Sequence, residues 1–189
     1  MGELRVIGGR WKKRRLVSPP EGKLKPTTDR VRAAFFNIVQ WQIAGCDFLD
    51  VFSGSGAVGV EALSRGVKSA TFIESNALNA RLIERNVEKI GSTEARVMKR
   101  DATLALEILE TQGAQFDVIY LDPPYDAQFL LEEALVILGR GGLLKKSATV
   151  VGEVRQGVRM LDTYGALKLE KDYTYGDTRL WVYVKEPDE

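Results

Sequence analysis

The sequence predicts an α/β fold with a parallel, doubly wound sheet and helices on both faces. From residue 46 onward, short apolar segments alternate with segments of helical periodicity. Five strand segments separated by four helical segments are the order that gives parallel strands joined by right-handed crossovers. A glycine-rich segment directly follows the first of these strands, as in open α/β sheets that bind ligands. A length of 189 residues fits one main domain.

The segment before the sheet divides into an arm and a helix. Residues 1–27 are expected to be extended or hairpin-like, because Gly8 and Gly9 offer a turn and Pro19 and Pro20 exclude a helix. A helix is expected over 29–39, with Thr28 or Asp29 as its N-cap. We therefore predict a basic arm (residues 1–27) and a core domain (residues 28–189).

The core domain is expected to end in a hairpin rather than a helix. Residues 167–175 and 178–184, joined around a Gly-Asp pair, show no helical periodicity and predict two antiparallel strands. The earlier strands are expected over 48–51, 70–74, 95–99, 117–121 and 148–153, and the helices over 57–65, 77–90, 102–111 and 129–138.

The composition excludes several classes of chemistry. The chain has no histidine and one cysteine, which excludes Ser-His-Asp and Cys-His mechanisms, and we expect no metal site. No apolar segment is long enough to cross a bilayer, and the N-terminus lacks a signal peptide. We expect a soluble, cytoplasmic protein without a membrane partner, whose chemistry uses carboxylates, hydroxyls, backbone groups or a cofactor.

The charge is segregated along the chain. The net charge is +1, but residues 1–32 carry +7 and the remainder carries −6. Basic arms commonly neutralise phosphates, and an aromatic residue inside this one adds stacking. The alternative is a solvated, disordered arm. The candidate nucleic-acid-binding residues are Arg5, Arg10, Trp11, Lys12, Lys13, Arg14 and Arg15.

The glycine-rich segment and three acids predict a nucleotide-like cofactor. The segment DVFSGSG follows the first strand, and the literal G-x-G-x-x-G that begins at Gly54 keeps an NAD-dependent oxidoreductase as an alternative. Asp50 would repel a pyrophosphate but suits an ammonium group, Glu74 suits ribose hydroxyls, and Asp101 suits an adenine amine. Each acid alone could be a helix cap. Together they predict S-adenosylmethionine, with Asp50, Phe52, Ser53, Gly54, Ser55, Gly56, Glu74, Ser75, Asp101, Ala102 and Asp122 as candidate cofactor-binding residues.

The segment Asp122-Pro123-Pro124-Tyr125 follows the fourth strand and predicts the reaction. Two prolines stiffen the loop and leave carbonyls as acceptors. If Asp122 and a proline carbonyl accept the two hydrogens of a base amine, the nitrogen lone pair can point at a sulfonium methyl group. Tyr125 would stack on the base. These four residues are the candidate catalytic residues, and a rigid turn capped by Asp122 is the alternative.

At this point the chain resembles the bacterial small-subunit ribosomal RNA guanine-N2 methyltransferases of the RsmD type. The resemblance spans nearly the whole length. It is carried by RVIGGRW from Arg5, KPTTDRVR from Lys25, the Phe36-Asn37 pair, DVFSGSG, LDPPY and the late Tyr175-Gly176-Asp177-Thr178. Lys25 stands where the family pattern has Arg, and Ala33 where it has Glu, so the first of these positions cannot bind a planar anion in bidentate fashion.

The resemblance implies a Rossmann-like class I methyltransferase fold, a mostly parallel sheet of seven strands whose last strand is antiparallel. It implies S-adenosylmethionine as the donor and the N2 amine of one guanine in small-subunit ribosomal RNA as the acceptor. Thr28 and Arg30 would close over the methionine end of the cofactor. The implied substrate is an assembled or assembling small subunit (30S particle), and the implied oligomeric state is a monomer.

Two further alternatives stay open. An adenine-amine methyltransferase on DNA or RNA would use the same Asp-Pro-Pro-Tyr chemistry, although no segment is large enough for an added duplex-reading region. A noncatalytic RNA-binding module of ribosome assembly would explain the arm. The choice of guanine over adenine rests on the resemblance alone.

Overall fold

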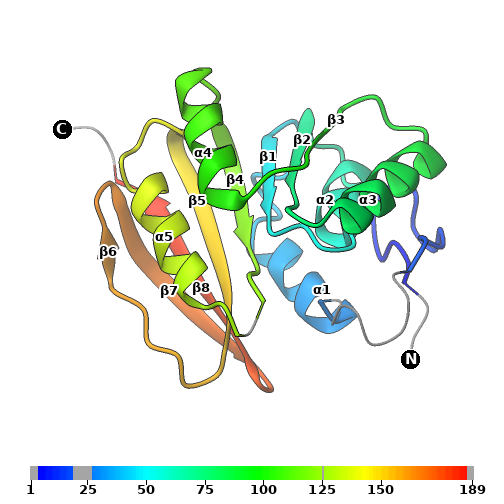
Figure 1. Cartoon of the computed structure of the whole chain (residues 1–189). Helices are drawn as coiled ribbons and strands as arrows, with labels where there is room; N and C mark the ends of the chain where they lie inside the picture. Colours follow the sequence, from blue (N-terminus) through cyan, green and yellow to red (C-terminus); the bar gives the residue numbers. More distant parts are fainter. Residues whose placement is uncertain (1–3, 19–26, 125, 187–189) are drawn as a thin grey trace.

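A computed structural model of the chain describes residues 4–18, 27–124 and 126–186, and these residues fold around one mixed sheet (Figure 1). In the described residues the sheet has eight strands in the order β3-β2-β1-β4-β5-β8-β7-β6. The strands are β1 (Asp47–Val51), β2 (Ser69–Ile73), β3 (Ala95–Met98), β4 (Phe116–Leu121), β5 (Leu144–Arg155), β6 (Thr163–Tyr164), β7 (Leu167–Tyr175) and β8 (Thr178–Lys185). The helices are α1 (Asp29–Ile38), α2 (Ala57–Ser64), α3 (Ala77–Ile90), α4 (Ala102–Thr111) and α5 (Phe129–Leu138).

The strand directions confirm the predicted class of fold. Strands β1 to β5 are mutually parallel, and β8 is antiparallel to both of its neighbours, β5 and β7. Each predicted helix is present and the predicted terminal hairpin is β7 and β8. The fold is therefore the predicted one, with a final antiparallel strand inserted beside β5.

Two details of the sheet differ from the prediction. The prediction of seven strands was wrong, because β6 adds a two-residue pairing with β7 that is too short to leave a periodic pattern. Strand β5 begins at Leu144 instead of residue 148, because Ser147 adopts a φ of 61° and the pairing register shifts between Phe116 and Val118. Such a bulge breaks the alternation from which a strand is predicted.

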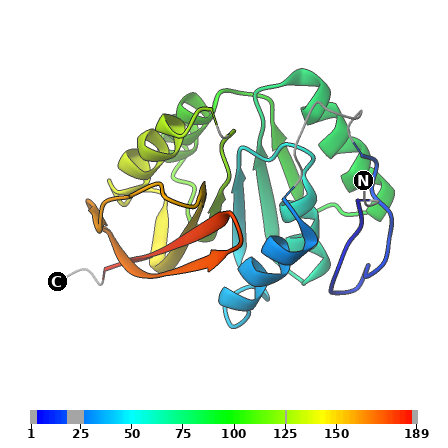
Figure 2. The same cartoon turned by 90° about the horizontal axis from the view of Figure 1, so that it is seen from below.

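The sheet separates two apolar layers. Helices α1, α2 and α3 pack on one face and α4 and α5 on the other, and Figure 2 shows α1 opposite α5 across the sheet. Neighbouring strand residues point to opposite faces: Phe48 lies in the same buried cluster as Phe35 and Tyr120, whereas Leu49 lies in the cluster that contains Leu106. In the described part of the chain no helix is long and apolar enough to span a membrane.

The described part of the arm is a hairpin docked on α2 and α3. An isolated bridge pairs Arg5 with Arg15, and the N–H of Leu16 donates to the carbonyl of Leu4 at 2.8 Å. Leu4, Val6 and Leu16 are buried in the same core as α1 and α2. A disordered arm is therefore wrong for these residues, whereas residues 19–26, which include Pro19, Pro20, Gly22 and Lys25, lie outside the described residues.

Two side chains anchor this hairpin through its backbone. The hydroxyl of Ser64 donates to the carbonyl of Gly8 at 2.6 Å and accepts from the N–H of Trp11 at 3.0 Å. The amide of buried Asn86 accepts from the N–H of Val17 at 2.7 Å and donates to its carbonyl at 3.1 Å and to the carbonyl of Ser55 at 3.3 Å. Asn86 thus joins the arm to the glycine-rich loop.

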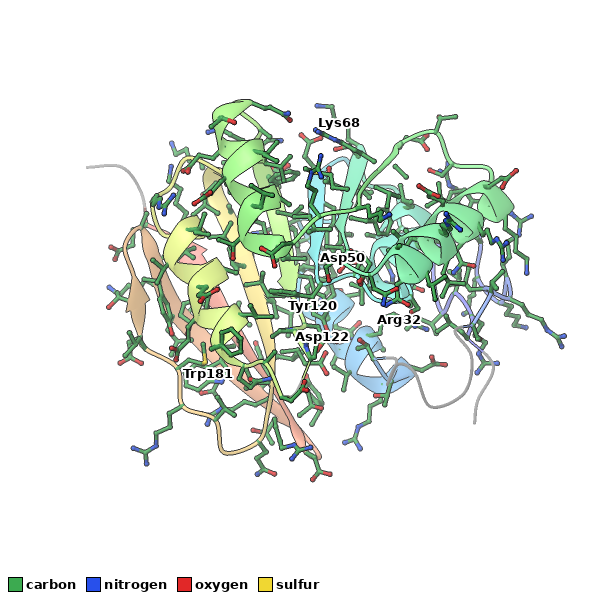
Figure 3. All side chains as sticks on the ribbon, viewed as in Figure 1. Arg32, Asp50, Lys68, Tyr120, Asp122 and Trp181 are labelled. Carbon is green, nitrogen blue, oxygen red and sulfur yellow. The ribbon has the colours of Figure 1, made fainter. Side chains whose placement is uncertain are left out.

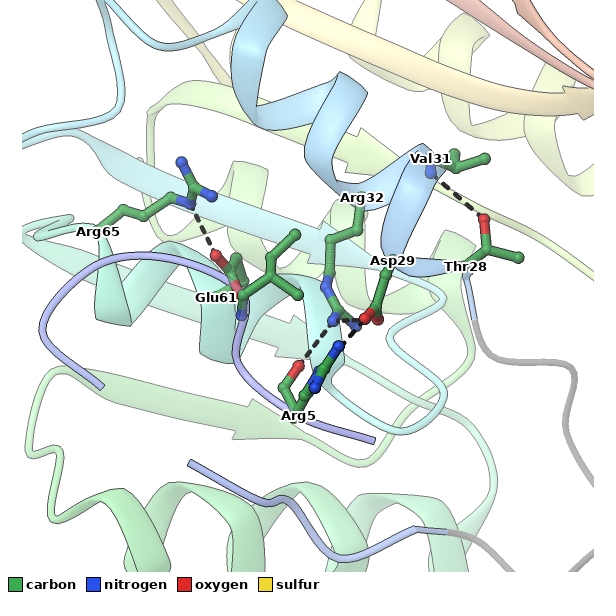
Figure 4. A network of polar contacts seen from close by, with 8 residues as sticks. Arg5, Thr28, Asp29, Val31, Arg32, Glu61 and Arg65 are labelled. Carbon is green, nitrogen blue, oxygen red and sulfur yellow. Dashed lines mark hydrogen bonds and ion pairs between the residues drawn. The ribbon is translucent and has the colours of Figure 1, made fainter. Parts of the chain in front are cut away.

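A buried arginine ties the hairpin to α1 (Figure 4). The guanidinium of Arg32 is fully buried and donates to the carbonyl of Arg5 at 2.7 Å and to the carboxylate of Asp29 at 2.8 Å. Burial lowers the pKa of Arg32, and the Asp29 carboxylate opposes that shift. The hydroxyl of Thr28 caps α1 by accepting from the N–H of Val31 at 3.3 Å. The first turn of α1 is therefore fixed by a backbone contact at Val31 and by the side-chain contact between Arg32 and Asp29.

Replacing Asn86 tests the docking of the arm. We expect Asn86→Ala to lower the free energy of unfolding by about 1–3 kcal/mol, because it leaves the half-buried backbone groups of Val17 and the buried carbonyl of Ser55 without this partner. We also expect faster proteolysis within residues 10–15. Urea unfolding and limited trypsin digestion measure the two effects. Asn37→Ala, an exposed position on α1, is the matched control, and equal proteolysis of the two variants would contradict this anchoring role.

Candidate active site

A cavity of about 590 Å³ lies at the carboxyl ends of the parallel strands. Its walls come from the β1–α2 loop, the ends of β2, β3 and β4, the start of α1, and residues of β5 and β8. This is the edge of an open α/β sheet at which ligands bind. In Figure 3, Asp50, Tyr120 and Asp122 lie toward this edge, whereas Lys68 lies at the opposite end of the sheet.

Most of the predicted site residues meet at this cavity. Its wall includes Thr28, Phe52, Ser53, Gly54, Ser55, Glu74, Ser75, Asp101, Ala102, Asp122, Pro123 and Pro124. Three predicted cofactor-binding residues, Arg30, Asp50 and Gly56, are not part of the wall. Tyr125 lies outside the described residues, so its stacking role stays a prediction.

The glycine-rich loop is held in an uncommon backbone conformation. Phe52, Gly54 and Gly56 have φ values of 65°, 53° and 75°, a region that non-glycine residues rarely occupy. A side chain at Gly56 would place its Cβ 2.9 Å from Ile83. The N–H of Ser53 donates to the carbonyl of Ile73 at 2.9 Å. Local bonding of this kind keeps Phe52 in its strained conformation.

Glu74 holds the loop from the end of β2. One carboxylate oxygen accepts from the N–H of Gly54 at 2.8 Å, and the other accepts from the N–H of Asn76 at 2.7 Å. Burial raises the pKa of Glu74, and these backbone hydrogen bonds lower it. A carboxylate has about four acceptor positions, so Glu74 can hold the loop and still accept from hydroxyls in the cavity.

Asp50 lies beneath the loop instead of facing the cavity. Its side chain is 2% exposed and accepts from the N–H of Gly59, in the first turn of α2, at 2.9 Å. Burial raises the pKa of Asp50 to about 7, the Gly59 hydrogen bond opposes this shift, and the charge of Glu74 adds to it. The predicted contact with an ammonium group stays a prediction, and the role that the structure gives to Asp50 is to fix α2 against β1.

Asp101 lies at the cavity, as predicted for a cofactor-binding residue, and it also caps a helix, which was the alternative role. It is the N-cap of α4 and accepts from the N–H groups of Thr103 at 3.0 Å and Leu104 at 3.3 Å. Asp101 nevertheless lines the cavity. A helix cap and an adenine acceptor are thus compatible here.

Around Asp122 the structure adds residues that the sequence interpretation missed. The hydroxyl of Thr27 donates to a carboxylate oxygen of Asp122 at 2.9 Å. Glu153, on β5, is 4% exposed and lines the cavity, and it accepts from the hydroxyl of Tyr120. The position of Glu153 near the carboxyl end of the fifth strand was a signal of the same kind that identified Asp50 and Glu74.

The candidate nucleic-acid-binding residues all lie on the arm hairpin, where their surroundings differ. The guanidinium of Arg10 lies 3.9 Å from the centre of the Trp11 ring and 3.8 Å from the carboxylate of Glu94. Arg5 pairs with Asp29 at 3.6 Å, and Arg14 donates to the carbonyl of Lys89 at 3.2 Å. The remaining members, Lys12, Lys13 and Arg15, have exposed side chains. Cations therefore cover the outer side of the hairpin.

Comparison with known proteins gives consistent relatives. A protein family described as conserved hypothetical protein 95 matches residues 4–184. The chain is 36% identical over 187 residues to "Ribosomal RNA small subunit methyltransferase D" of Escherichia coli (strain K12), covering 98% of this chain and 91% of that one. It is 33% identical to "Putative rRNA methyltransferase YlbH" of Bacillus subtilis, covering 96% and 99%. The solved structure of "Putative methyltransferase yhhF" from Escherichia coli matches with a TM-score of 0.85 at 32% identity, covering 98% and 99%.

The raised pKa of Asp50 predicts a pH dependence of stability. An acid with a pKa near 3.9 when unfolded and about 7 when folded binds more protons in the native state between these values. The stability that it contributes is therefore present below about pH 4 and lost as pH rises to about 7. Relative to the wild type, Asp50→Asn should gain a few kcal/mol in unfolding free energy from about pH 4 to pH 8.

Urea unfolding across this pH range measures the difference. Asp177→Asn, on the exposed β7–β8 turn, is the control for removing a carboxylate and should follow the wild type at every pH. A constant offset between Asp50→Asn and the wild type would show that folding does not raise the pKa of Asp50.

Proposed function

The chain belongs to the conserved hypothetical protein 95 family, and we propose on this premise that it methylates small-subunit ribosomal RNA with S-adenosylmethionine, at the N2 amine of a guanine. The single observation that carries the proposal is the meeting of Asp122-Pro123-Pro124 with Glu74 and Asp101 around one cavity. Relatives named as methyltransferases of small-subunit ribosomal RNA support the choice of RNA.

The residues of the cavity fit this cofactor. A volume of about 590 Å³ lies within the range of small-molecule sites. In this proposal Glu74 binds the ribose hydroxyls and Asp101 binds the adenine amine, and both residues line the cavity together with Ser53, Gly54 and Ser55. When bound, the cofactor supplies a methyl group on a sulfonium, which is reactive because its leaving group is neutral. Thr28 lines the same wall, and Arg30 on α1 is exposed nearby.

Asp122 and Pro123 orient the base amine in this proposal. The carbonyl of Pro124 accepts from the N–H of Ala127 at 2.9 Å, so we assign the amine contact to the carbonyl of Pro123. Asp122 accepts the second amine hydrogen while Thr27 holds its other side. Orientation of the lone pair is the main contribution of the protein, and the surplus proton leaves after transfer, so a chain without histidine suffices. Tyr125 stacks on the base plane in the same proposal.

The arm binds RNA phosphates in this proposal, and the chain acts as a monomer on an assembled or assembling small subunit. Phosphate contacts position a protein on RNA, whereas a base drawn out of its stack is read in a pocket. The docked hairpin presents its cations at a fixed place relative to the cavity, because Arg32 and Asn86 bind its backbone. Phosphate binding is thus assigned to the arm, and recognition of the base is assigned to the cavity.

Asp122→Ala tests the chemistry. Small subunits from cells that lack the protein are incubated with S-adenosylmethionine, and the nucleosides are identified by mass spectrometry. The wild type should produce N2-methylguanosine, and Asp122→Ala should slow transfer by on the order of a hundredfold while cofactor binding persists. Asp162→Ala, at an exposed carboxylate away from the cavity, should retain the wild-type rate.

The same assay separates the alternatives. N6-methyladenosine as the product would reassign the base, and no methylation with intact RNA binding would indicate an assembly module. Full activity of Asp122→Ala would refute the proposed orientation of the amine.

Neutralising the turn of the arm tests RNA binding. We expect Lys12→Gln with Lys13→Asn to weaken RNA binding and to reduce the slope of log affinity against log salt by about 0.7 for each phosphate that the arm no longer neutralises. Asparagine suits the φ of 72° at position 13. Lys68→Gln with Lys146→Gln removes equal charge near the amino ends of β2 and β5, away from the arm. An equal change of slope in both double variants would contradict a specific role for the arm.

A further inference from the structure

We propose that Glu153 selects guanine over adenine in this cavity by accepting the N1–H of the target base. The inference rests on the proposed function, because it concerns the base whose amine Asp122 holds. Glu153 is 4% exposed, lies on β5 and lines the cavity together with Asp122 and Pro123. The sequence interpretation gave it no role.

The strand register places the two carboxylates next to each other. Strands β4 and β5 are parallel, with Tyr120 opposite Val151 and Leu121 opposite Gly152. The next residues are Asp122, directly after the end of β4, and Glu153 on β5. Because alternate residues share a face and adjacent strands lie about 4.8 Å apart, both side chains follow Tyr120 and Val151 on the same face of the sheet. The base-amine acceptor therefore has a second acceptor beside it.

Both carboxylates are held by neighbouring hydroxyl groups. The Tyr120 hydroxyl donates to one oxygen of Glu153, and the Thr27 hydroxyl donates to one oxygen of Asp122 at 2.9 Å. Tyr120 is 1% exposed, and burial raises its pKa well above the usual value, so its hydroxyl keeps the proton that it donates. Held in this way, Glu153 is a fixed acceptor instead of a mobile one.

The edge of the base explains the selectivity. Guanine presents its N1–H directly beside the N2 amine, so two adjacent donors meet two adjacent acceptors. Adenine presents an unprotonated N1 beside its amine, and an ionised carboxylate accepts hydrogen bonds but donates none. In the same pose, the lone pair of adenine N1 would face a lone pair of the Glu153 carboxylate. Neither buried group would then have a hydrogen-bond partner. Sites built around a hydrogen bond reject analogues that lack it.

A base analogue tests this assignment directly. The modified guanine is first mapped with the wild type, and 2-aminopurine is then placed at that position of the RNA by ligation and assembled into the small subunit. This base keeps the amine and lacks the N1–H. We expect the wild type to methylate guanine on the order of a hundredfold faster than 2-aminopurine, because one buried acceptor loses its donor.

Glu153→Gln should narrow this ratio to about tenfold or less, because a glutamine amide can donate to the unprotonated N1. 2-Aminopurine also lacks the O6 oxygen of guanine, but this loss affects the wild type and Glu153→Gln equally. The difference between their guanine-to-2-aminopurine rate ratios therefore reports on N1 alone. Tyr120→Phe, which removes the hydroxyl that positions Glu153, should narrow the ratio to an intermediate extent. Glu170→Gln, at an exposed position on β7, is the matched control and should keep the wild-type ratio.

The outcomes separate the inference from the proposed function. An unchanged ratio in a folded Glu153→Gln protein overturns the role of Glu153 even when guanine is methylated. If Glu153→Gln fails to fold, as judged by circular dichroism, Tyr120→Phe takes its place. An unchanged rate ratio in folded Tyr120→Phe then overturns the role of Glu153. Absence of N2-methylguanosine with the wild type refutes the proposed function and with it this inference.

Discussion

The candidate site depends on backbone N–H groups that donate into two buried carboxylates. Gly59, in the first turn of α2, donates to Asp50, and Gly54 of the preceding loop donates to Glu74. The parallel pairing of β1 and β2 brings the two carboxylates to the same edge of the sheet. Burying them is unfavourable, as the raised pKa values of both residues show. Their hydrogen bonds keep the loop open in a backbone conformation that Phe52 would otherwise rarely adopt.

A second constraint connects the arm with the cavity. The guanidinium of Arg32 binds the backbone of the arm at Arg5 and the first turn of α1 at Asp29. Thr27 and Thr28, which directly precede that turn, line the cavity, and Thr27 binds Asp122. The hairpin, the start of α1 and the Asp-Pro-Pro loop therefore form one connected set of contacts. A change in the position of the arm would be transmitted to the carboxylate that is proposed to hold the base amine.

The central strands followed from short apolar segments because this fold buries β1, β2 and β4 on both faces. What periodicity could not predict were local exceptions, such as the bulge at Ser147 and the two-residue strand β6. The site was predictable as a set of strand ends, so Glu74 and Asp101 were found, and by the same reasoning Glu153 could have been. The inward burial of Asp50 was not predictable, since it depends on the hydrogen bond from Gly59 across the loop. Thr27 required knowledge of how α1 packs over the sheet.

The opposite charges of the arm and the core domain suit a nucleic acid that must enter base first. The first 32 residues carry +7 and the rest of the chain carries −6, and the cavity itself is lined by Glu74, Asp101, Asp122 and Glu153. In the proposed function, these carboxylates accept the N–H groups of a base, while the arm attracts phosphates outside the cavity. The proposed function needs no histidine, because the carboxylates of Glu74, Asp101, Asp122 and Glu153 act in it as hydrogen-bond acceptors. With Glu153 in the proposed role, the base is selected by the hydrogen-bond donors that its edge offers at adjacent positions, and guanine is the purine that offers two such donors.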